Sequence, residues 1–354
     1  MILKSFTFKT KDWQLKGLDN LALTNLLVGV NASGKTRTIR SLISVVSFLQ
    51  SKPYLFQVSG FKTNLEFENE EEDFHKMIYS FEIENGNVKS ESLKVDNSIL
   101  IKRTVGKALL KGEPIDPPEN KLITQIRRDR TQYPQIEKLM AWAEKVTFIS
   151  FSVLNPFTHI MSNPFEINPE SFSDMIDSFT AEEKKNFLKE VSALGYKVSD
   201  IDVISVAENK IVEIKESTVK TKIVELLLSN GMLRVLYIMA FLIKLRRESD
   251  KYGLLLIDDL GEGLDYQRAT ELGRKVFSTC EKYKVQLIAS SNDGLIMDVV
   301  DLQKWQILRR VKSRIHTINY SKYPGLYEEF YCTGLSNFDF FSSDFIDRYL
   351  QSKK

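Results

Sequence analysis

Gly29-Val30-Asn31-Ala32-Ser33-Gly34-Lys35-Thr36 is the stretch that decides the fold, because it matches the pattern G-x-x-x-x-G-K-[ST]. An apolar run precedes it and a helical pattern through about Leu49 follows it, which is the context that a phosphate-binding loop needs. In such a loop the backbone N–H groups face a phosphate, the lysine reaches the β- and γ-phosphates, and the threonine hydroxyl can ligate Mg²⁺. The alternative is a strand-to-helix turn that holds no ligand. The predicted ATP-binding residues are Gly29, Asn31, Ala32, Ser33, Gly34, Lys35, Thr36 and Arg37.

A second part of a nucleotide site follows far downstream. Leu254 to Ile257 is typical of a buried strand, and it ends in Asp258 and Asp259. By itself, an apolar run that ends in two acids is a common feature. Behind an intact phosphate-binding loop, it predicts that Asp258 and Thr36 together hold Mg²⁺.

Composition limits the class of protein. With 354 residues, 43% hydrophobic and 27% charged, the chain is in the ordinary globular range and can bury a sizeable core. Lys and Arg (49) nearly balance Asp and Glu (47), so any nucleic-acid site has to be a local patch. The two cysteines form no metal-ligand spacing, and no apolar run is long enough to span a membrane. We therefore expect a cytoplasmic protein without a membrane segment.

Hydrophobic periodicity predicts a mixed α/β protein. Strands are expected over Ile2 to Phe8 and Leu21 to Val30, and consecutive antiparallel hairpins over Gln57 to Arg103. From Val105 to Gln135 the chain is polar and contains prolines, which indicates a loop with a short helix. A further strand, VTFISFSV, comes before a second proline-containing loop.

The second half of the chain predicts a helical lobe and then a parallel sheet. Ser171 to Leu194 has the spacing of amphipathic helices, and a hairpin and a helix starting after Ser229 follow it. The last third alternates strands with helices, so we expect it to share one sheet with the N-terminal part. The predicted domains are a nucleotide-binding core, 1–154 and 200–354, which includes the hairpins 57–103, and an inserted helical lobe, 155–199.

The order of these features resembles that of a known group of ATPases. The phosphate-binding loop, the hairpins, the helical lobe, Leu228-Ser-Asn-Gly-Met232, Gly263-Leu-Asp265 and Ala289-Ser-Ser-Asn292 occur in the order of ABC-type ATPases of the RecF/SMC/OLD-like group, often labelled AAA family ATPases. The resemblance covers nearly the whole chain. It implies a P-loop NTPase fold with a mixed sheet core, an antiparallel β subdomain and a helical lobe.

The resemblance also implies roles for individual residues. Ser229, Asn230 and Gly231 would form the signature loop that covers the γ-phosphate of a nucleotide held by a partner subunit; the alternative is that Ser229 only caps the following helix. Gly263, Leu264 and Asp265 would form the loop between two nucleotide sites, or else a turn before a helix. The implied assembly is a head-to-tail homodimer around two ATP molecules, and a higher oligomer stays open.

Two positions depart from the group's pattern. The base after the magnesium-binding aspartate is usually glutamate, and here it is Asp259, which is one methylene shorter. The usual switch histidine is replaced by Asn292, whose amide can contact a γ-phosphate oxygen but cannot exchange a proton as imidazole does. With Lys35, these are the predicted catalytic residues, and they indicate intact ATP binding with slow hydrolysis. Glu262 is an alternative acid.

Three other features have two interpretations each. The basic clusters 127–130, 244–247 and 309–314 could contact DNA or form solvated faces. Aromatic residues between Phe330 and Phe345 could dock a partner or pack the core. Trp13 could stack on adenine, or cover the sheet from a short edge strand.

Two functions of different class remain. The first is an ATPase that cycles on DNA, as in RecF/SMC-like repair. The second, which Asp259 and Asn292 favour, is a nucleotide-gated scaffold or sensor for a separately encoded effector protein. Relatives in bacterial phage-defence operons resemble this second arrangement.

The absence of sustained a/d heptads between Thr36 and Asp258 excludes long SMC-type coiled-coil arms. A transporter ATPase is disfavoured because the signature departs from LSGGQ. Both functions require ATP and Mg²⁺.

Overall fold

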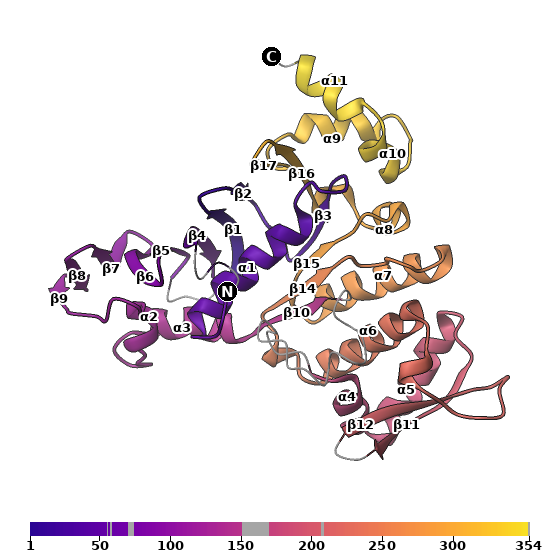
Figure 1. Ribbon diagram of the computed structural model, residues 1–354. Coiled ribbons are helices and arrows are strands. Elements are labelled where there is room, and N and C mark those ends of the chain that lie inside the picture. The colour runs from indigo at the N-terminus through magenta and orange to yellow at the C-terminus, as the bar shows by residue number, and fades with distance from the viewer. Residues whose placement is uncertain (55, 57–58, 70–73, 151–169, 207–208, 353–354) are drawn as a thin grey trace.

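A single twisted sheet runs through the molecule and carries helices on both faces (Figure 1). The computed structural model describes residues 1–54, 56, 59–69, 74–150, 170–206 and 209–352. Within these residues, fourteen strands form the main sheet, which confirms the expected mixed α/β fold. In spatial order they are β10 (Val146–Ser150), β14 (Leu254–Asp258), β15 (Gln286–Ser290), β3 (Thr24–Val28), β16 (Trp305–Val311), β17 (Arg314–Ile318), β2 (Gln14–Leu18), β1 (Ile2–Lys9), β4 (Phe61–Glu68), β5 (Lys76–Glu84), β6 (Asn87–Val95), β7 (Ser98–Thr104), β8 (Lys107–Leu110) and β9 (Glu113–Pro114).

The parallel half of the sheet joins the two ends of the chain, as expected. β3 lies between β15 and β16 and runs parallel to both, and β14 and β10 continue the parallel set. β3, β14 and β15 are buried at every position, because helices cover both of their faces. Leu26 and Val28 face one hydrophobic core and Leu27 faces the other. Alternate side chains of β3 thus point to opposite faces of the sheet, and each face has its own hydrophobic core.

The antiparallel half forms an arm at the left of Figure 1. The expected hairpins are confirmed as β5, β6 and β7, which pair in sequence order. The loop expected after Val105 is wrong in part, because Lys107–Leu110 and Glu113–Pro114 continue the sheet as β8 and β9. β1 pairs with β2 and β4 and so belongs to this half. Strands of four and two residues are too short to show hydrophobic periodicity, so the sequence gives them no clear signal.

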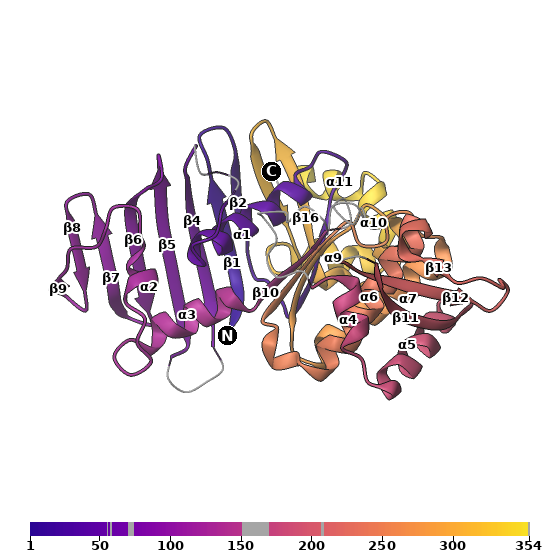
Figure 2. The ribbon, with the colours of Figure 1, turned by 60° about the horizontal axis from the view of Figure 1, so that its bottom comes forward.

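Helices cover the sheet on both faces. The first core packs α6 and α7 against the sheet, while the second lies under α1 and α3. Figure 2 shows α2 and α3 lying across strands of the arm. In the described chain no helix has the length and apolar character needed to cross a membrane. The helices are α1 (Lys35–Leu49), α2 (Ile123–Ile126), α3 (Pro134–Glu144), α4 (Phe172–Asp177), α5 (Ala181–Ala193), α6 (Asn230–Arg247), α7 (Tyr266–Lys282), α8 (Gly294–Val299), α9 (Pro324–Tyr331), α10 (Asn337–Ser342) and α11 (Phe345–Ser352).

A smaller unit lies at the lower right of Figure 1. The expected amphipathic helices are present as α4 and α5, and they pack on a three-stranded sheet of β11 (Val198–Val206), β12 (Asn209–Glu216) and β13 (Ile223–Val224). The first part of the predicted lobe, 155–169, lies outside the described residues. The division of the chain into core and lobe at 155 and 199 therefore stays a prediction.

A buried carboxylate fastens the arm to the helix that follows it. Glu91 on β6 is 1% exposed and accepts hydrogen bonds from the backbone N–H groups of Ile123 (2.7 Å) and Thr124 (3.2 Å) and from the Tyr79 hydroxyl (3.0 Å). The two N–H groups belong to the first turn of α2, which has no side-chain cap of its own. Burial raises the pKa of Glu91, although these donors oppose the shift. Glu91 therefore acts as a helix cap supplied by a neighbouring strand.

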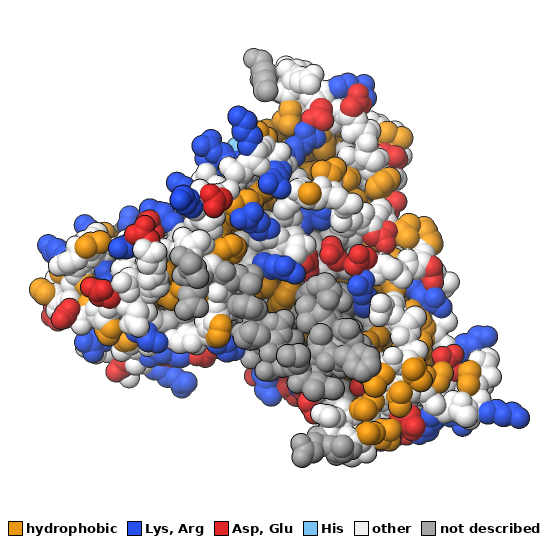
Figure 3. Space-filling view, in the orientation of Figure 1, with side chains coloured by type: hydrophobic (Ala, Val, Ile, Leu, Met, Phe, Trp, Pro, Cys, Tyr) orange, Lys and Arg blue, Asp and Glu red, His pale blue; other side chains and the backbone are white. Residues whose placement is uncertain are grey.

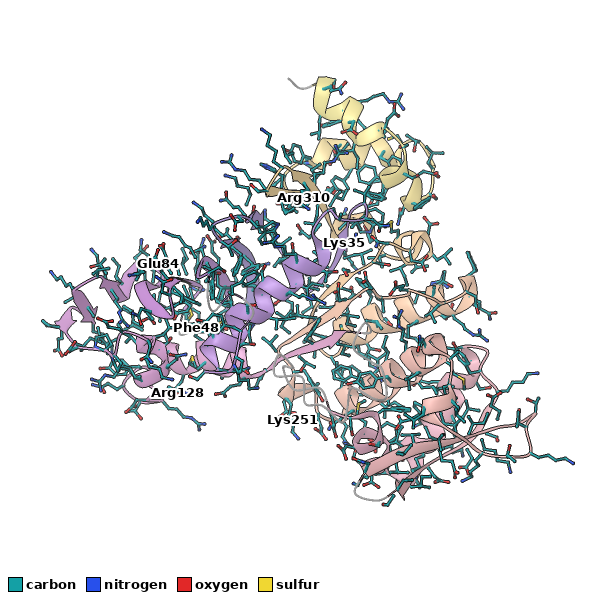
Figure 4. All side chains as sticks on the ribbon, viewed as in Figure 1. Lys35, Phe48, Glu84, Arg128, Lys251 and Arg310 are labelled. Carbon is teal, nitrogen blue, oxygen red and sulfur yellow. The ribbon has the colours of Figure 1, made fainter. Side chains whose placement is uncertain are left out.

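We expect Glu91→Ala to lower the free energy of unfolding by about 3 kcal/mol, because it leaves two buried N–H groups and a buried hydroxyl without their acceptor. Urea denaturation followed by circular dichroism measures this loss. Glu84→Ala is the matched control: this exposed residue (Figure 4) pairs with Lys89 at 3.4 Å, and we expect a change within about 0.5 kcal/mol. Equal losses for the two variants would contradict the capping role.

Candidate nucleotide site

The predicted phosphate-binding loop connects β3 to α1. Gly34 stands at the N-cap of α1 with φ +105°, and a Cβ there would lie 3.0 Å from the Ile315 side chain, so glycine is required. No side chain caps this helix, so its first N–H groups and the positive end of its dipole face the loop. Lys35 folds back and donates to the carbonyl oxygens of Gly29 (2.5 Å) and Val30 (3.3 Å). The geometry is that of an anion-binding loop.

The two predicted magnesium ligands meet. The Thr36 hydroxyl donates to Asp258 Oδ1 at 3.2 Å, and the Ser290 hydroxyl donates to the same oxygen at 2.6 Å. Ser290 also accepts the backbone N–H of Asp259 at 2.9 Å. Mg²⁺ characteristically takes one or two protein oxygens and completes its shell with water and substrate phosphates. Thr36 and Asp258 fit that role, with Ser290 holding the carboxylate in position.

Asp259 lies next to Lys35 in an unusual backbone conformation. Its φ is +56°, in the left-handed region that Asp and Asn tolerate better than most residues. Burial raises the pKa of Asp259, with Asp258 and Glu262 adding to the rise. Burial lowers the pKa of Lys35, while Asp259 and Asp258 oppose that change. The attraction between Lys35 and Asp259 thus opposes the pKa shift that burial causes in each group.

A cavity of about 520 Å³ collects most of the predicted ATP-binding residues and all three predicted catalytic residues. In its lining, Asn292 donates to the side chain of Asn31 at 2.9 Å. The Arg37 guanidinium, also in the lining, lies 4.8 Å from the ring of Trp13. The residues lining the cavity are Trp13, Asn31, Ala32, Gly34, Lys35, Thr36, Arg37, Arg40, Phe56, Asp259, Asn292 and Arg310.

Trp13 lines the cavity but is largely covered. It is 2% exposed, packs against Phe8, and has the Arg37 guanidinium over its ring. It precedes β2, which lies between β17 and β1, so the expected edge strand is wrong, whereas the contact with Phe8 of β1 agrees with a residue that covers the sheet. Stacking of Trp13 on adenine stays a prediction.

Sequence reasoning missed Ser290 and Arg310 as site residues. Arg310 is near Lys35 in Figure 4 and donates to the Ala32 carbonyl at 3.4 Å. Burial and the nearby Arg310 lower the pKa of Arg37, as expected where like charges share a cavity. Arg310 comes near the loop because Ile307 of β16 pairs with Val28 of β3, and this pairing can be recognised only once the order of the strands in the sheet is known. Ser290 lies in the motif Ala289-Ser-Ser-Asn292, which contributes to the resemblance, but the resemblance assigns this serine no role.

The predicted signature and inter-site loops lie together, apart from the cavity lining. Ser229 caps α6 by accepting the Met232 N–H at 3.3 Å, so the capping interpretation is confirmed. Asp265 caps α7 in the same way, by accepting the Arg268 N–H at 3.1 Å. A Cβ on Gly231 would lie 2.9 Å from the Gly263 carbonyl oxygen, so the loops touch. Neither Asn230 nor the other signature residues line the cavity of their own chain.

Glu262, the alternative acid, is turned away from the cavity. Arg234 of α6 donates to its carbonyl oxygen at 2.6 Å and to its carboxylate at 3.2 Å. Glu262 does not line the cavity, whereas Asp259 does. Of the two carboxylates, Asp259 is the one placed beside Lys35 and Thr36.

Carboxylates neutralise the second basic cluster and pair with one arginine in each of the other two. Arg128 pairs with Glu137 and Glu144, and Arg309 pairs with Asp347. The three cations of the second cluster each have a carboxylate; the pairs are Lys244 with Glu170, Arg246 with Glu190, and Arg247 with Glu183 and Glu248. These pairs favour solvated faces over a continuous DNA surface.

Most of the C-terminal aromatic residues belong to the core. Phe330 and Phe340 are 1% and 0% exposed and contact one another with their rings tilted by 51°, and Phe345 packs against both. Tyr331 and Phe338 are exposed by 47% and 39%. The core interpretation therefore holds for the first three, and the other two lie at the surface.

The sheet order, the phosphate-binding loop and the lobe together define the fold of an ABC-type ATPase head. Among solved structures, the chain is similar to an Smc head bound to the C-winged helix domain of ScpA, at 12% identity and TM-score 0.56, over 91% of this chain and 99% of that one. It is also similar to Smc heads from Pyrococcus furiosus, with an extended coiled coil and bound to the C-terminal domain of ScpA, and from Pyrococcus yayanosii, with a coiled coil and joint. Both are 10% identical, over 93% of this chain and 99% of each, at TM-scores of 0.52 and 0.50. No family model and no curated protein matches the sequence. The likeness therefore establishes the fold.

We expect Ser290→Ala to weaken magnesium-dependent binding of ATP by about tenfold or more, because the Asp258 carboxylate loses the hydroxyl that orients it. Titration of a fluorescent ATP analogue with and without Mg²⁺ measures the effect. Ser278→Ala, on the exposed side of α7, is the control and should change nothing. A loss of affinity that is equal with and without Mg²⁺ would rule out the orienting role.

Proposed function

We propose that the chain is an ATP-binding head of the ABC type that binds Mg²⁺ with Thr36 and Asp258. The observation that carries the proposal is the single cavity in which the phosphate-binding loop, Asp259 and Asn292 converge next to the Thr36–Asp258 pair. Bound Mg²⁺ would neutralise charge on the β- and γ-phosphates. In this arrangement Lys35 leaves the carbonyls of Gly29 and Val30 for the phosphates.

Hydrolysis is slow in this proposal. The Asp259 carboxylate reaches one methylene less far than glutamate toward an attacking water, and misplacement on the ångström scale costs about a hundredfold in rate. Asn292 holds Asn31 of the loop and can donate to a γ-phosphate oxygen, but it cannot shuttle a proton. Binding is thus retained while the chemical step is weakened.

ATP joins two copies head to tail in this proposal. Ser229, Asn230, Gly231, Gly263 and Asp265 do not line their own chain's cavity, which leaves them for the cavity of a second copy. Large apolar residues are exposed beside each motif: Val30 in the phosphate-binding loop (66%), Leu227 before Ser229 (76%) and Tyr266 after Asp265 (71%). Figure 3 shows basic and acidic side chains on neighbouring parts of this face, an arrangement that suits antiparallel pairing.

The biological role in this proposal is that of a nucleotide-gated scaffold or sensor for a separate effector, as in phage-defence systems. Slow hydrolysis keeps the ATP-bound dimer long-lived, which suits a signal more than a motor. Two of the similar heads are bound to parts of ScpA, which supports a partner protein for this head as well. The alternative of a DNA-associated cycling ATPase has less support, because carboxylates pair with every cation of the cluster 244–247 and with Arg128 and Arg309 of the other two clusters.

We expect the purified protein to bind ATP and hydrolyse it slowly, and Asp259→Glu to raise kcat by about tenfold, because a longer carboxylate comes nearer to the water. Single-turnover hydrolysis of labelled ATP measures the rates, with binding followed in parallel. Asp259→Asn should abolish hydrolysis and keep binding.

Lys35→Ala is the control for the site and should lose ATP binding. If the unmodified protein turns over at ordinary rates and Asp259→Glu brings no gain, Asp259 is a competent base and the cycling ATPase is correct. If neither ATP binding nor hydrolysis depends on Lys35, the proposed function fails.

We expect Tyr266→Asp to prevent ATP-dependent pairing and to leave ATP binding within about twofold, because it puts a charge into the buried centre of the proposed interface. Light scattering after size exclusion, with ATP and the Asp259→Asn background, measures the mass. Val105→Asp is the matched control, since Val105 is 79% exposed on the arm, away from the motifs. Pairing that survives Tyr266→Asp would place the interface elsewhere.

A further inference from the structure

The short helix α8 connects the predicted switch residue to the rest of the molecule. It begins at Gly294, directly after Asn292 and its capping residue Asp293, whose carboxylate accepts the Leu295 N–H at 2.8 Å. Asn292 in turn contacts Asn31 of the phosphate-binding loop. Any shift of the start of α8 therefore moves Asn292 relative to the loop.

Helix α10, which precedes the last helix of the chain, contacts α8 at its start and near its end. The Phe338 ring lies on Gly294, so close that a Cβ on this glycine would be 2.9 Å from the ring. The Phe338 N–H donates to Asp298 at 2.8 Å, and the Asn337 side chain donates to the carbonyl of Val300 at 2.9 Å. Figure 1 shows α10 next to α8. We call the contacts of Asn337 and Phe338 with α8 the α10 clasp.

The opposite side of α8 contacts the loop that follows Asp259. A Cβ on Gly261 would lie 2.6 Å from the Ile296 side chain, and one on Gly273 of α7 would lie 3.0 Å from it. α8 is thus packed between the clasp on one side and α7 and the Asp259 loop on the other. The two polar groups proposed to act at the γ-phosphate both depend on the position of α8. Asn292 directly precedes the helix, and Asp259 begins the loop that packs against it.

We propose that Phe338 and Asn337 are positioning residues for ATP hydrolysis, which set α8 and thereby Asn292 against the γ-phosphate. The inference rests on the proposed function and adds to it two residues that do not line the cavity. A six-residue helix is too short to hold its own position in water, so its neighbours determine where it lies. Because α7 also holds α8, loss of the clasp displaces the helix without unfolding the head.

A purely structural role and a positioning role differ in what they change. The contacts that define the clasp are made with α8 and with Val300 directly after it, so ATP affinity should be kept when the clasp is broken. Only the step that needs Asn292 in place should slow. A positioning role therefore predicts a lower kcat with unchanged ATP affinity and an unchanged melting temperature.

The test is single-turnover hydrolysis and ATP binding by the full chain carrying Phe338→Ala, Asn337→Ala, or Phe338→Tyr, which keeps the ring. We expect the two alanine variants to lose on the order of tenfold or more in kcat with ATP affinity within about twofold, and Phe338→Tyr to keep activity. Leu335→Ala is the matched control, because Leu335 is 56% exposed in the segment before α10. Unchanged kcat in Phe338→Ala would overturn the inference.

A second pair of variants tests the contact itself. Gly294→Ala places a methyl against the Phe338 ring and should lower kcat, and shrinking the ring with Phe338→Leu in the same chain should restore part of it. Additive losses, with no recovery, would contradict a direct contact that sets α8.

A readout without turnover separates this inference from the proposed function. Hydrogen exchange of the ATP-free protein, read by mass spectrometry, should show faster exchange over 292–300 in Phe338→Ala and no change over 29–36. If exchange responds in this way but the unmodified protein does not bind ATP, the proposed function fails and the mechanical coupling stands. If exchange over 292–300 does not change, the clasp does not position α8 and the inference fails.

Discussion

The parallel register of β14, β15 and β3 is the constraint on which the site depends. Ile257 is level with Ala289, and Ala289 with Leu26, so Asp258, Ser290 and the start of the phosphate-binding loop emerge at one edge of the sheet. Three segments far apart in sequence thereby meet within hydrogen-bond distance. A slip of one residue would turn every side chain to the other face and separate Thr36 from Asp258. The burial of all three strands on both faces holds the register.

The sequence was informative where local chemistry dictates the residue. Gly34, Lys35 and Thr36 are required by the loop itself, and the buried run before Asp258 is required by a strand covered on both faces, so both could be recognised without the fold. Arg310 could not, because only the pairing of β16 with β3 brings it to the loop. Strands β8 and β9 were missed for a different reason: with four and two residues, they are too short to establish an alternating pattern.

The motifs at the starts of α6 and α7 show a different limit. Ser229 and Asp265 are good helix caps, and capping alone explains why serine and aspartate stand there. Yet capping does not exclude a second role. A serine hydroxyl that accepts an N–H through a lone pair can still donate its own proton to a phosphate oxygen. Both caps form within a single chain and carry no information about a contact to a second chain. Neither the sequence nor the structure of one chain therefore identifies such a contact.

The departure at Asp259 has a structural reason. The chain turns sharply after β14 so that the Leu260 N–H reaches the Ser290 carbonyl at 2.8 Å, and residue 259 takes a positive φ to make that turn. Aspartate tolerates this conformation better than most residues, whereas a longer side chain gains reach at some cost in backbone energy. The same turn puts Gly261 against Ile296 of α8. The shape of this loop therefore links three properties: the shorter acid, the position of its carboxylate beside Lys35, and the packing of the helix that carries Asn292. Slow chemistry in this head would follow from the loop's geometry as much as from one missing methylene.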